Sequence, residues 1–302
     1  MNQAPINTGE RPLWRKIVDF PLVAMVIGTV VVFATIAVSA YVSGNLIPAV
    51  AGLTPHMTFD VVCALLLILV YKLVIRHLGE HKQDDLRIRG ALRPLGIGLA
   101  AGVAVFSAAV AIAALLGVYR LVGEGDLSDL LPQLILSAIF PAVSEEMLFR
   151  GILFRWIEEF GGSWAALLLT SAFFGAAHLA NPHASPIAAV GIALEAGVML
   201  GAAYMLTRSL WLPMGIHAAW NFTQGEIYDI PVSGTPVHGV LVARLSGPPL
   251  LTGNGFGLEA SLIAIIVATL FGLALLWLAV KKGELMQPLW VRRRLSATQT
   301  SG

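Results

Sequence analysis

The chain has 302 residues, of which 57% are hydrophobic and only 12% are charged, and its mean hydropathy is +0.80. Water-soluble domains carry about 25% charged residues. These values therefore exclude a cytosolic enzyme, a disordered chain and a fibrous chain, and they indicate a polytopic membrane protein. The net charge of +1 argues against nucleic acid as a partner, and the single cysteine, Cys63, cannot form an internal disulfide.

Eight stretches are apolar enough to cross a membrane as helices, which need about 20 such residues each. The seventh is short and polar for a helix that faces lipid, so we expect neighbouring helices to shield it. The expected fold class is all-α, with about eight transmembrane helices around an interior cavity. The stretches are residues 20–42, 57–76, 95–119, 128–149, 163–180, 186–206, 210–225 and 259–280.

Lys and Arg predict the orientation, because cytoplasmic segments of membrane proteins carry an excess of them. If the N-terminus is cytoplasmic, only Arg120 and Arg244 of the 19 Lys and Arg residues fall in outer segments. Both termini are therefore expected in the cytoplasm, and residues 77–93 form a charged inner loop. The outer loop 226–258 is rich in Gly and Pro, and we expect a solvated connection, with a lid or a partly re-entrant segment as alternatives.

The spans divide the chain into three parts. Residues 1–125 hold the first three helices and the basic inner loop, and residues 126–226 hold a helical core that contains the polar groups described next. Residues 227–302 hold the outer loop, the last helix and a basic tail that we expect to be disordered beyond Leu295.

Ionisable residues at membrane depth are costly and usually functional, and here they cluster in the fourth, fifth and seventh spans. Glu146 and Arg150 are four residues apart, so they share a helix face and can pair. Glu145 lies about 100° around the helix from Glu146 and is free to point elsewhere. Pro141 removes a backbone hydrogen bond and is expected to kink this helix just before the acidic pair.

The fourth and fifth spans join near residues 161–162, and Glu145 and His178 are about equally far along the chain from that turn. In an antiparallel hairpin that rises 1.5 Å per residue, both reach a level about 24 Å from the turn, so they can face each other. His217 and Asn221 are four residues apart and share a face of the seventh span. We expect that face to reach the same level, because the fourth helix is expected to extend past the lipid.

These groups suit the hydrolysis of an amide. A carboxylate and an imidazole that face each other can hold a water and remove its proton. A second histidine with an asparagine supplies hydrogen-bond donors for a developing oxyanion, each worth roughly 3–4 kcal/mol in known cases.

The residues form three motifs in order, which are Glu-Glu-x-x-x-Arg at 145–150, Phe-x-x-x-His at 174–178 and His-x-x-x-Asn at 217–221. Together they resemble the motifs of the CAAX protease and bacteriocin-processing (CPBP) family, whose eukaryotic members are the type II CAAX prenyl endopeptidases of the Rce1 type. The resemblance covers about residues 126–226, a third of the chain. It implies an intramembrane endopeptidase of the glutamate type with eight helices.

The resemblance also implies roles for six residues. Glu145 and His178 would activate water, Glu146 and Arg150 would support the site, and His217 and Asn221 would form the oxyanion pocket. It implies a peptide or a membrane-associated protein as substrate, prenylated or not, and we expect no cofactor. We expect an integral protein of a bacterial-type inner or plasma membrane, with the active site on the cytoplasmic side.

Purely structural roles for the same residues stay open. The acidic pair and Arg150 can form a purely structural ion-pair network, and His217 and Asn221 can serve as interhelical hydrogen bonds. A zinc site is the chemical alternative, since one carboxylate and two imidazoles are a ligand set that zinc accepts. No His-Glu-x-x-His helix is present to fix two such ligands at once.

Two alternatives concern the whole protein. One is a non-catalytic scaffold or immunity protein of the same architecture. The other is a transporter in which Glu145, Glu195 and the histidines form a proton path. The chain shows no internal repeat of the kind that many transporters carry, which disfavours the second alternative.

Overall fold

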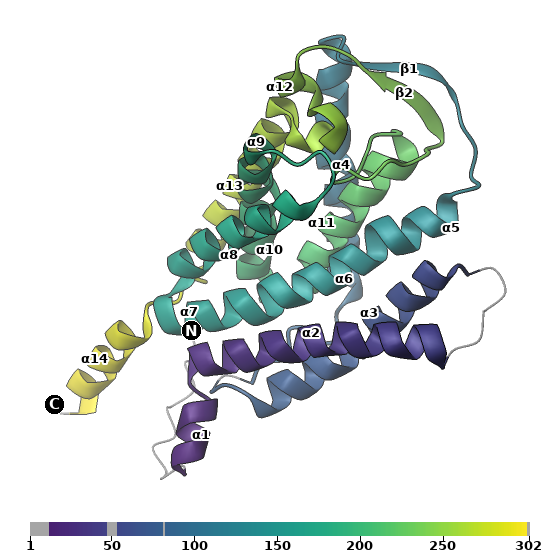
Figure 1. Cartoon of the computed structure of the whole chain (residues 1–302). Helices are drawn as coiled ribbons and strands as arrows, with labels where there is room; N and C mark the ends of the chain where they lie inside the picture. Colours follow the sequence, from purple (N-terminus) through teal and green to yellow (C-terminus); the bar gives the residue numbers. More distant parts are fainter. Residues whose placement is uncertain (1–11, 47–52, 81, 301–302) are drawn as a thin grey trace.

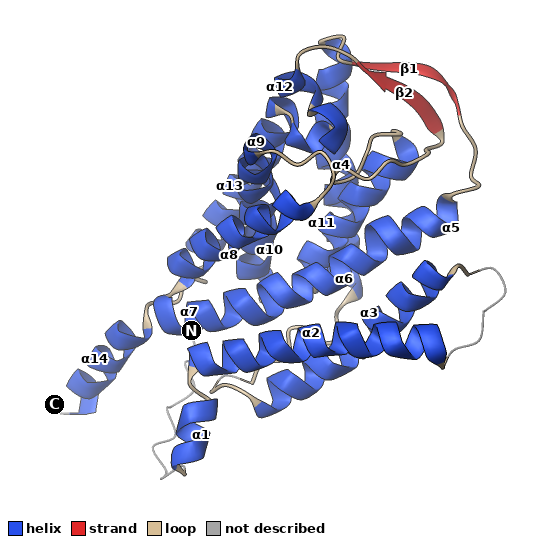
Figure 2. Ribbon diagram, in the orientation of Figure 1, coloured by secondary structure: helices blue, strands red, loops and turns tan. Residues whose placement is uncertain are grey.

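A computed structural model describes residues 12–46, 53–80 and 82–300, with side chains described up to residue 298 (Figure 1). Residues 1–11 of the first predicted part and 301–302 of the third lie outside the described residues. The described chain is mostly helical, with a small two-stranded sheet at one tip (Figure 2). The prediction of an all-α polytopic membrane protein is confirmed at this level.

Six helical stretches of the described part are long and apolar enough to cross a membrane. They correspond to the first, second, third, fifth, sixth and eighth predicted spans. The stretches are α2 (Pro21–Asn45), α3 (Pro55–His77), α4 (Leu92–Leu115), α8 (Ser163–Ala177) with the 3-10 turn η3 (His178–Ala180), α9 (Pro186–Ile192) with the π-helical turn η4 (Ala193–Gly197) and α10 (Val198–Thr207), and α13 (Leu262–Lys281).

The fourth and seventh predicted spans are also helical, and that they cross a membrane stays a prediction. The fourth is one helical run from Leu130 to Gly161, so it does continue past its apolar part as expected. It consists of α5 (Leu130–Pro132), η1 (Gln133–Ile139), α6 (Phe140–Glu146), η2 (Met147–Phe154) and α7 (Arg155–Gly161), where η1 and η2 are π-helical. The seventh is α11 (Trp211–Phe222), extended by the π-helical turn η5 (Thr223–Ile227).

The helices form two groups that cross at an angle (Figure 1). In the lower group α2 and α3 pack beside the run from α5 to α7, and the upper group contains α4, α8, α10, α11 and α13. Helix α11 packs against α4 of the upper group and against α6 and η1 of the lower one. It therefore lies where the two groups meet, and it carries its polar residues there.

Two glycines let α4 approach α11 at backbone distance. A Cβ atom at Gly98 would lie 2.5 Å from the carbonyl oxygen of Leu212, and one at Gly102 would clash with the carbonyl oxygen of Ile216. Most of α11 is buried as a result. The shielding that the sequence predicts for this short polar helix is confirmed.

The outer loop 226–258 is folded into a cap over the upper group, which corrects the expectation of a solvated connection. Its strand β2 (Leu241–Leu245) pairs antiparallel with β1 (Tyr119–Glu124), which follows α4. The cap continues through α12 (Pro249–Thr252), η6 (Asn254–Phe256) and η7 (Leu258–Ala260). Ile230, Phe256 and Leu258 are fully buried, and the burial of such apolar residues explains why the loop folds.

The tail predicted to be disordered beyond Leu295 is instead the helix α14 (Leu289–Thr300). Trp290 packs edge-on against Phe160, with ring centroids 5.8 Å apart, and Arg292 donates to the carbonyl oxygen of Glu159 at 2.6 Å. These contacts anchor the start of α14 at the end of α7. At the other end of the chain, the short helix α1 (Leu13–Val18) precedes α2.

Candidate functional site

The site begins at a proline in the fourth helical run. Pro141 has no N–H, so the carbonyl oxygen of Ser137, four residues earlier, loses its usual helical donor. Asn221 of α11 donates to that oxygen through Nδ2 at 2.8 Å. The hydrogen bond joins α11 to the fourth run about two turns before the acidic pair. Asn221 therefore does make an interhelical hydrogen bond, as one of the structural interpretations proposed. The second N–H of its amide is left for another acceptor.

Glu146 is the centre of a buried cluster. Its Oε1 accepts from Nη1 of Arg150 at 2.8 Å and lies 2.9 Å from Nδ1 of His217. Glu146 and Arg150 are 0% and 1% exposed. Because the carboxylate of an ion pair can only accept, Nδ1 of His217 carries a proton and donates it. The predicted pair of Glu146 and Arg150 is present, and it also orients His217.

Arg150 extends the cluster to a third element. Its Nη2 donates to the carbonyl oxygens of Ala196 and Gly197, at 3.1 Å and 3.3 Å. These carbonyls lie in the π-helical turn η4, whose altered bonding pattern leaves main-chain groups for side chains to satisfy. The guanidinium carbon also lies 4.7 Å from the ring centroid of Phe174, within the range of a cation–π contact.

Within the described residues, the ion pair of Arg150 is with Glu146, and the charged partner found near Glu145 is His217. The Oε2 atom of Glu145 lies 4.0 Å from Nε2 of His217, which is too long for a direct hydrogen bond. That oxygen is buried and has no hydrogen-bond partner among the described residues, while the whole side chain is 32% exposed. The histidine placed against Glu145 is thus His217 of α11, which sequence spacing alone did not pair with it.

His178 contacts Phe174 through both its ring and a hydrogen bond. Its Nδ1 lies 2.7 Å from the carbonyl oxygen of Phe174, and since a carbonyl can only accept, this nitrogen carries the proton. The rings of His178 and Phe174 have centroids 4.7 Å apart, and the rings of Phe174 and His217 are 6.3 Å apart. Phe174 therefore packs against both imidazoles.

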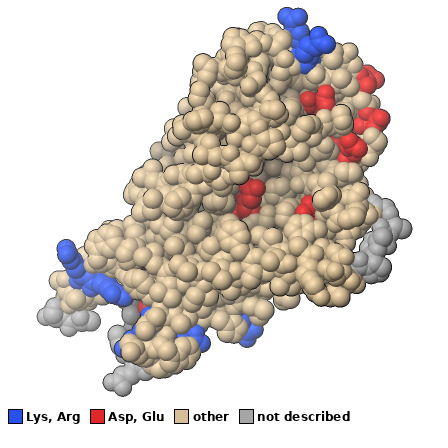
Figure 3. Space-filling model, viewed as in Figure 1, with Lys and Arg blue, Asp and Glu red and all other residues tan. Residues whose placement is uncertain are grey.

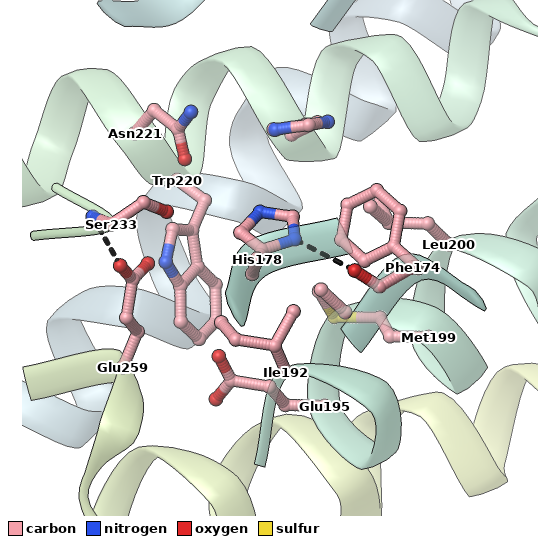
Figure 4. A pocket seen from close by; sticks show the side chains of 12 residues that line it. Phe174, His178, Ile192, Glu195, Met199, Leu200, Trp220, Asn221, Ser233 and Glu259 are labelled. Atoms are coloured by element: carbon pink, nitrogen blue, oxygen red, sulfur yellow. Dashed lines mark hydrogen bonds between the residues drawn. The ribbon is translucent and has the colours of Figure 1, made fainter. Parts of the chain in front are cut away.

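A cavity of about 30 Å³ lies beside these rings, which is room for about one or two waters. His178, His217 and Asn221 line it, whereas the glutamates of the acidic pair are not among the described residues that do. Figure 4 shows His178 and Asn221 on one side of the cavity and the carboxylates of Glu195 and Glu259 on another.

Sequence reasoning did not find every residue of this cavity. Glu195 was named as a possible proton carrier, and it is 1% exposed with Oε2 unpartnered among the described residues. Glu259 and Ser233 of the cap were missed, and the Glu259 carboxylate accepts from the main-chain N–H of Ser233. Burial raises the pKa of Glu259, in the 3-10 turn η7 before α13, to about 7. An acid at the first position of the last predicted span, residues 259–280, was the available signal.

The surface agrees with an acidic site between the helix groups. Figure 3 shows Asp and Glu side chains inside a hollow on this face, while Lys and Arg gather near α1 and α14 and at the tip beside the sheet. In the part of the chain that the structure describes, no group of three or more His, Cys, Asp and Glu side chains is placed to hold a metal ion. The zinc alternative, with Glu145, His178 and His217 as ligands, gains no support from this geometry.

Comparison with known proteins gives one match. The family model described as "Type II CAAX prenyl endopeptidase Rce1-like" matches residues 127–223. This stretch contains all three motifs and almost coincides with the region 126–226 expected from the sequence. No curated protein and no solved structure matches the chain. The match confirms the resemblance seen in the sequence: in this polytopic membrane protein, residues 127–223 are similar to the type II CAAX prenyl endopeptidases of the Rce1-like family.

Proposed function

We propose that this protein is an intramembrane endopeptidase that hydrolyses a peptide bond of a membrane-associated substrate, using a water activated by Glu145 and an imidazole. A CAAX-protease-related role follows from the family match. The mechanism and the substrate are the proposed part. The observation that carries the proposal is the convergence of three separate motifs on one site, through Glu146, Arg150, His217 and Phe174.

In this proposal Glu145 is the general base. The 4.0 Å gap between Glu145 Oε2 and His217 Nε2 is short enough for one water to touch both groups. Glu145 would take a proton from this water as the water oxygen attacks the peptide carbonyl carbon, and it would return the proton to the leaving nitrogen. His178 would assist in the activation of the water through Nε2, because its hydrogen bond to the Phe174 carbonyl uses only Nδ1.

The other residues would stabilise the negative charge that develops on the peptide oxygen. The amide of Asn221 keeps one N–H beyond its bond to Ser137. Nε2 of a protonated His217 would shift its single hydrogen bond from the water to the peptide oxygen as the water attacks. Glu146 and Arg150 would act as positioning residues, because they contact the imidazole rather than the reacting atoms. No step in this scheme requires a metal ion.

The test is peptide cleavage by the purified full chain in detergent. Two quenched-fluorescence peptides serve as probes, one ending in a farnesylated Cys-aliphatic-aliphatic-X sequence and the other identical but unprenylated. We expect Glu145→Gln and His178→Ala each to lower the cleavage rate by about 10²- to 10⁴-fold with an unchanged melting temperature. Glu124→Gln, on the exposed strand β1, is the matched control and should cleave normally.

Full activity in Glu145→Gln would contradict the proposed role of the acid. If a cellular phenotype of the protein survived Glu145→Gln while cleavage stopped, the non-catalytic scaffold would be favoured instead. A preference for the farnesylated peptide would place the substrate among prenylated proteins, and equal cleavage would place it among other membrane-associated peptides.

A further inference from the structure

A second and much larger cavity, of about 910 Å³, lies at the end of the molecule where the inner loop meets three helices. Its walls come from residues 83–94, from residues 206–212 before and at the start of α11, and from the C-terminal half of α13. It shares no lining residue with the smaller cavity beside Glu195 and Glu259, which we call the acidic cavity. Its volume lies in the range of sites that bind small molecules and cofactors.

The mouth of this cavity carries uncompensated positive charge. Arg87, Arg89 and Arg93 line it and are exposed, and within the described residues none of their side chains makes an ion pair or a hydrogen bond. The other charged residues in its walls already have partners of opposite charge. These pairs are Arg208 with Glu158 and Glu284, Lys282 with Glu284, Asp84 with Lys72, and Asp85 with Arg155.

Deeper in, the walls become apolar. Ile97 and Ala101 lie about 6 Å and 12 Å beyond Arg93 along α4, at 1.5 Å per residue. Phe271, Leu275 and Leu278 of α13 and Ile216 of α11 form the facing wall. The cavity thus has a cationic mouth and, deeper in, an apolar lining that could contact a hydrocarbon chain.

Trp211 marks the level of the mouth. Its ring also lines the cavity, and its Nε1 donates to the main-chain carbonyl oxygen of Arg87 at 2.9 Å. Tryptophan gathers at membrane–water interfaces, where its ring sits at the level of the lipid headgroups. In a membrane, this position of Trp211 would put the three arginines at headgroup level and the apolar walls at the level of the acyl chains.

We propose that this cavity binds an anionic phospholipid from the membrane leaflet on the basic side of the protein. The headgroup phosphate would pair with Arg87, Arg89 and Arg93, whose planar guanidinium groups match phosphate oxygens. An acyl chain would lie along the walls formed by α4 and α13. A net negative headgroup is favoured over a zwitterionic one, because the two carboxylates among the described residues of the walls, Asp84 and Asp85, are already paired and are not free to meet a choline ammonium.

The experiment measures lipid binding to the full chain in detergent by mass spectrometry of the intact complex. The probes are phosphatidylglycerol, phosphatidylcholine with the same acyl chains, and glycerol phosphate without chains. We expect phosphatidylglycerol to bind at least about tenfold more tightly than phosphatidylcholine. The triple variant Arg87→Gln, Arg89→Gln, Arg93→Gln should lose at least about tenfold in affinity for phosphatidylglycerol.

A charge-matched control removes three arginines outside the cavity, through Arg76→Gln, Arg293→Gln and Arg294→Gln. It should lose less than about threefold. A separate variant, Ala101→Phe, fills the apolar part of the cavity and leaves the arginines in place, so it should weaken phosphatidylglycerol binding and leave glycerol phosphate binding unchanged.

Equal losses in the triple variant and its control would overturn the proposal, since they would indicate attraction to the whole basic surface. Equal binding of the two phospholipids would also overturn it, and so would glycerol phosphate binding as tightly as phosphatidylglycerol, because that would identify a free phosphate site. The measurement is repeated in Glu145→Gln, so the result does not depend on whether the protein cleaves peptides.

Discussion

Glu146 has more than one partner, and this decides how its substitution must be interpreted. One oxygen serves both Arg150 and His217, while its other oxygen and Nε of Arg150 find no hydrogen-bond partner among the described residues. Removing one member of a buried ion pair costs about 3–5 kcal/mol, because the other charge is left without compensation. A loss of activity in a single variant would therefore mix the effects of unfolding and chemistry.

A double variant separates these effects. We expect Arg150→Met alone to lower the free energy of unfolding by about 3–5 kcal/mol, since it strands the Glu146 carboxylate. Glu146→Gln with Arg150→Met leaves no isolated charge and should recover most of the melting temperature in detergent. Peptide cleavage should not recover, because His217 loses the carboxylate that orients it. A double variant as unstable as the single one would contradict this account.

At the residue level, local spacing predicts local contacts and little more. The pair of Glu146 and Arg150 follows from a separation of four residues on one helix. The contact between Glu146 and His217 depends on how α11 crosses the fourth run, which spacing along the chain does not determine. Matched chain distances predicted that His178 faces Glu145, whereas the structure places His217 beside Glu145. His178 sits in a 3-10 turn, and its Nδ1 bonds to the Phe174 carbonyl.

At the level of elements, the packing of α11 against α4 positions His217 and Asn221 of α11 against the fourth helical run. His217 and Asn221 reach the fourth run only because α11 can lie at backbone distance from α4, where Gly98 and Gly102 leave space. A side chain at Gly102 would force the two helices apart, since its Cβ atom would already meet the carbonyl oxygen of Ile216 and the Cβ atom of Ala219.

We therefore expect Gly102→Leu to abolish peptide cleavage and to lower stability by about 1–3 kcal/mol or more through overpacking. Gly96→Leu is the matched control, because it lies on the same helix and a Cβ atom there meets nothing within 4 Å. Cleavage assays and thermal unfolding of the two variants provide the measurement. Equal behaviour of both would show that the α4–α11 contact does not position the site.

The six long apolar helices were predictable from their composition and length, whereas the cap was not. Strands β1 and β2 are short, and they pair across more than a hundred residues of sequence, so neither shows a pattern that a local reading detects. Helix α14 was missed for a related reason. Its composition is that of a polar tail, and its order comes from contacts of Trp290 and Arg292 with the end of α7.

At the level of the whole molecule, the charge distribution and the cap give opposite indications for the side on which the site opens. The sequence predicts both termini in the cytoplasm, with the cap outside, and the site was expected on the cytoplasmic side. Yet Ser233 of the cap and Glu259 beside it line the acidic cavity. If the predicted orientation is right, the cavity faces the outer side, and the basic cavity faces the cytoplasm.

Labelling of single cysteines tests this orientation, and Cys63→Ser supplies a background free of thiols because the chain has one cysteine. We expect Asp126→Cys, in the exposed segment that follows β1, to react with a membrane-impermeant maleimide in intact cells. Lys82→Cys, in the exposed inner loop, should react only after the membrane is permeabilised, because the positive-inside rule places its basic neighbours in the cytoplasm.

The reverse labelling pattern would mean that the whole protein has the opposite orientation. The acidic cavity would then lie on the cytoplasmic side, since Asp126 and the cap are joined through β1 and β2. Reaction of both cysteines in intact cells would instead mean that the region between them does not cross the membrane an odd number of times.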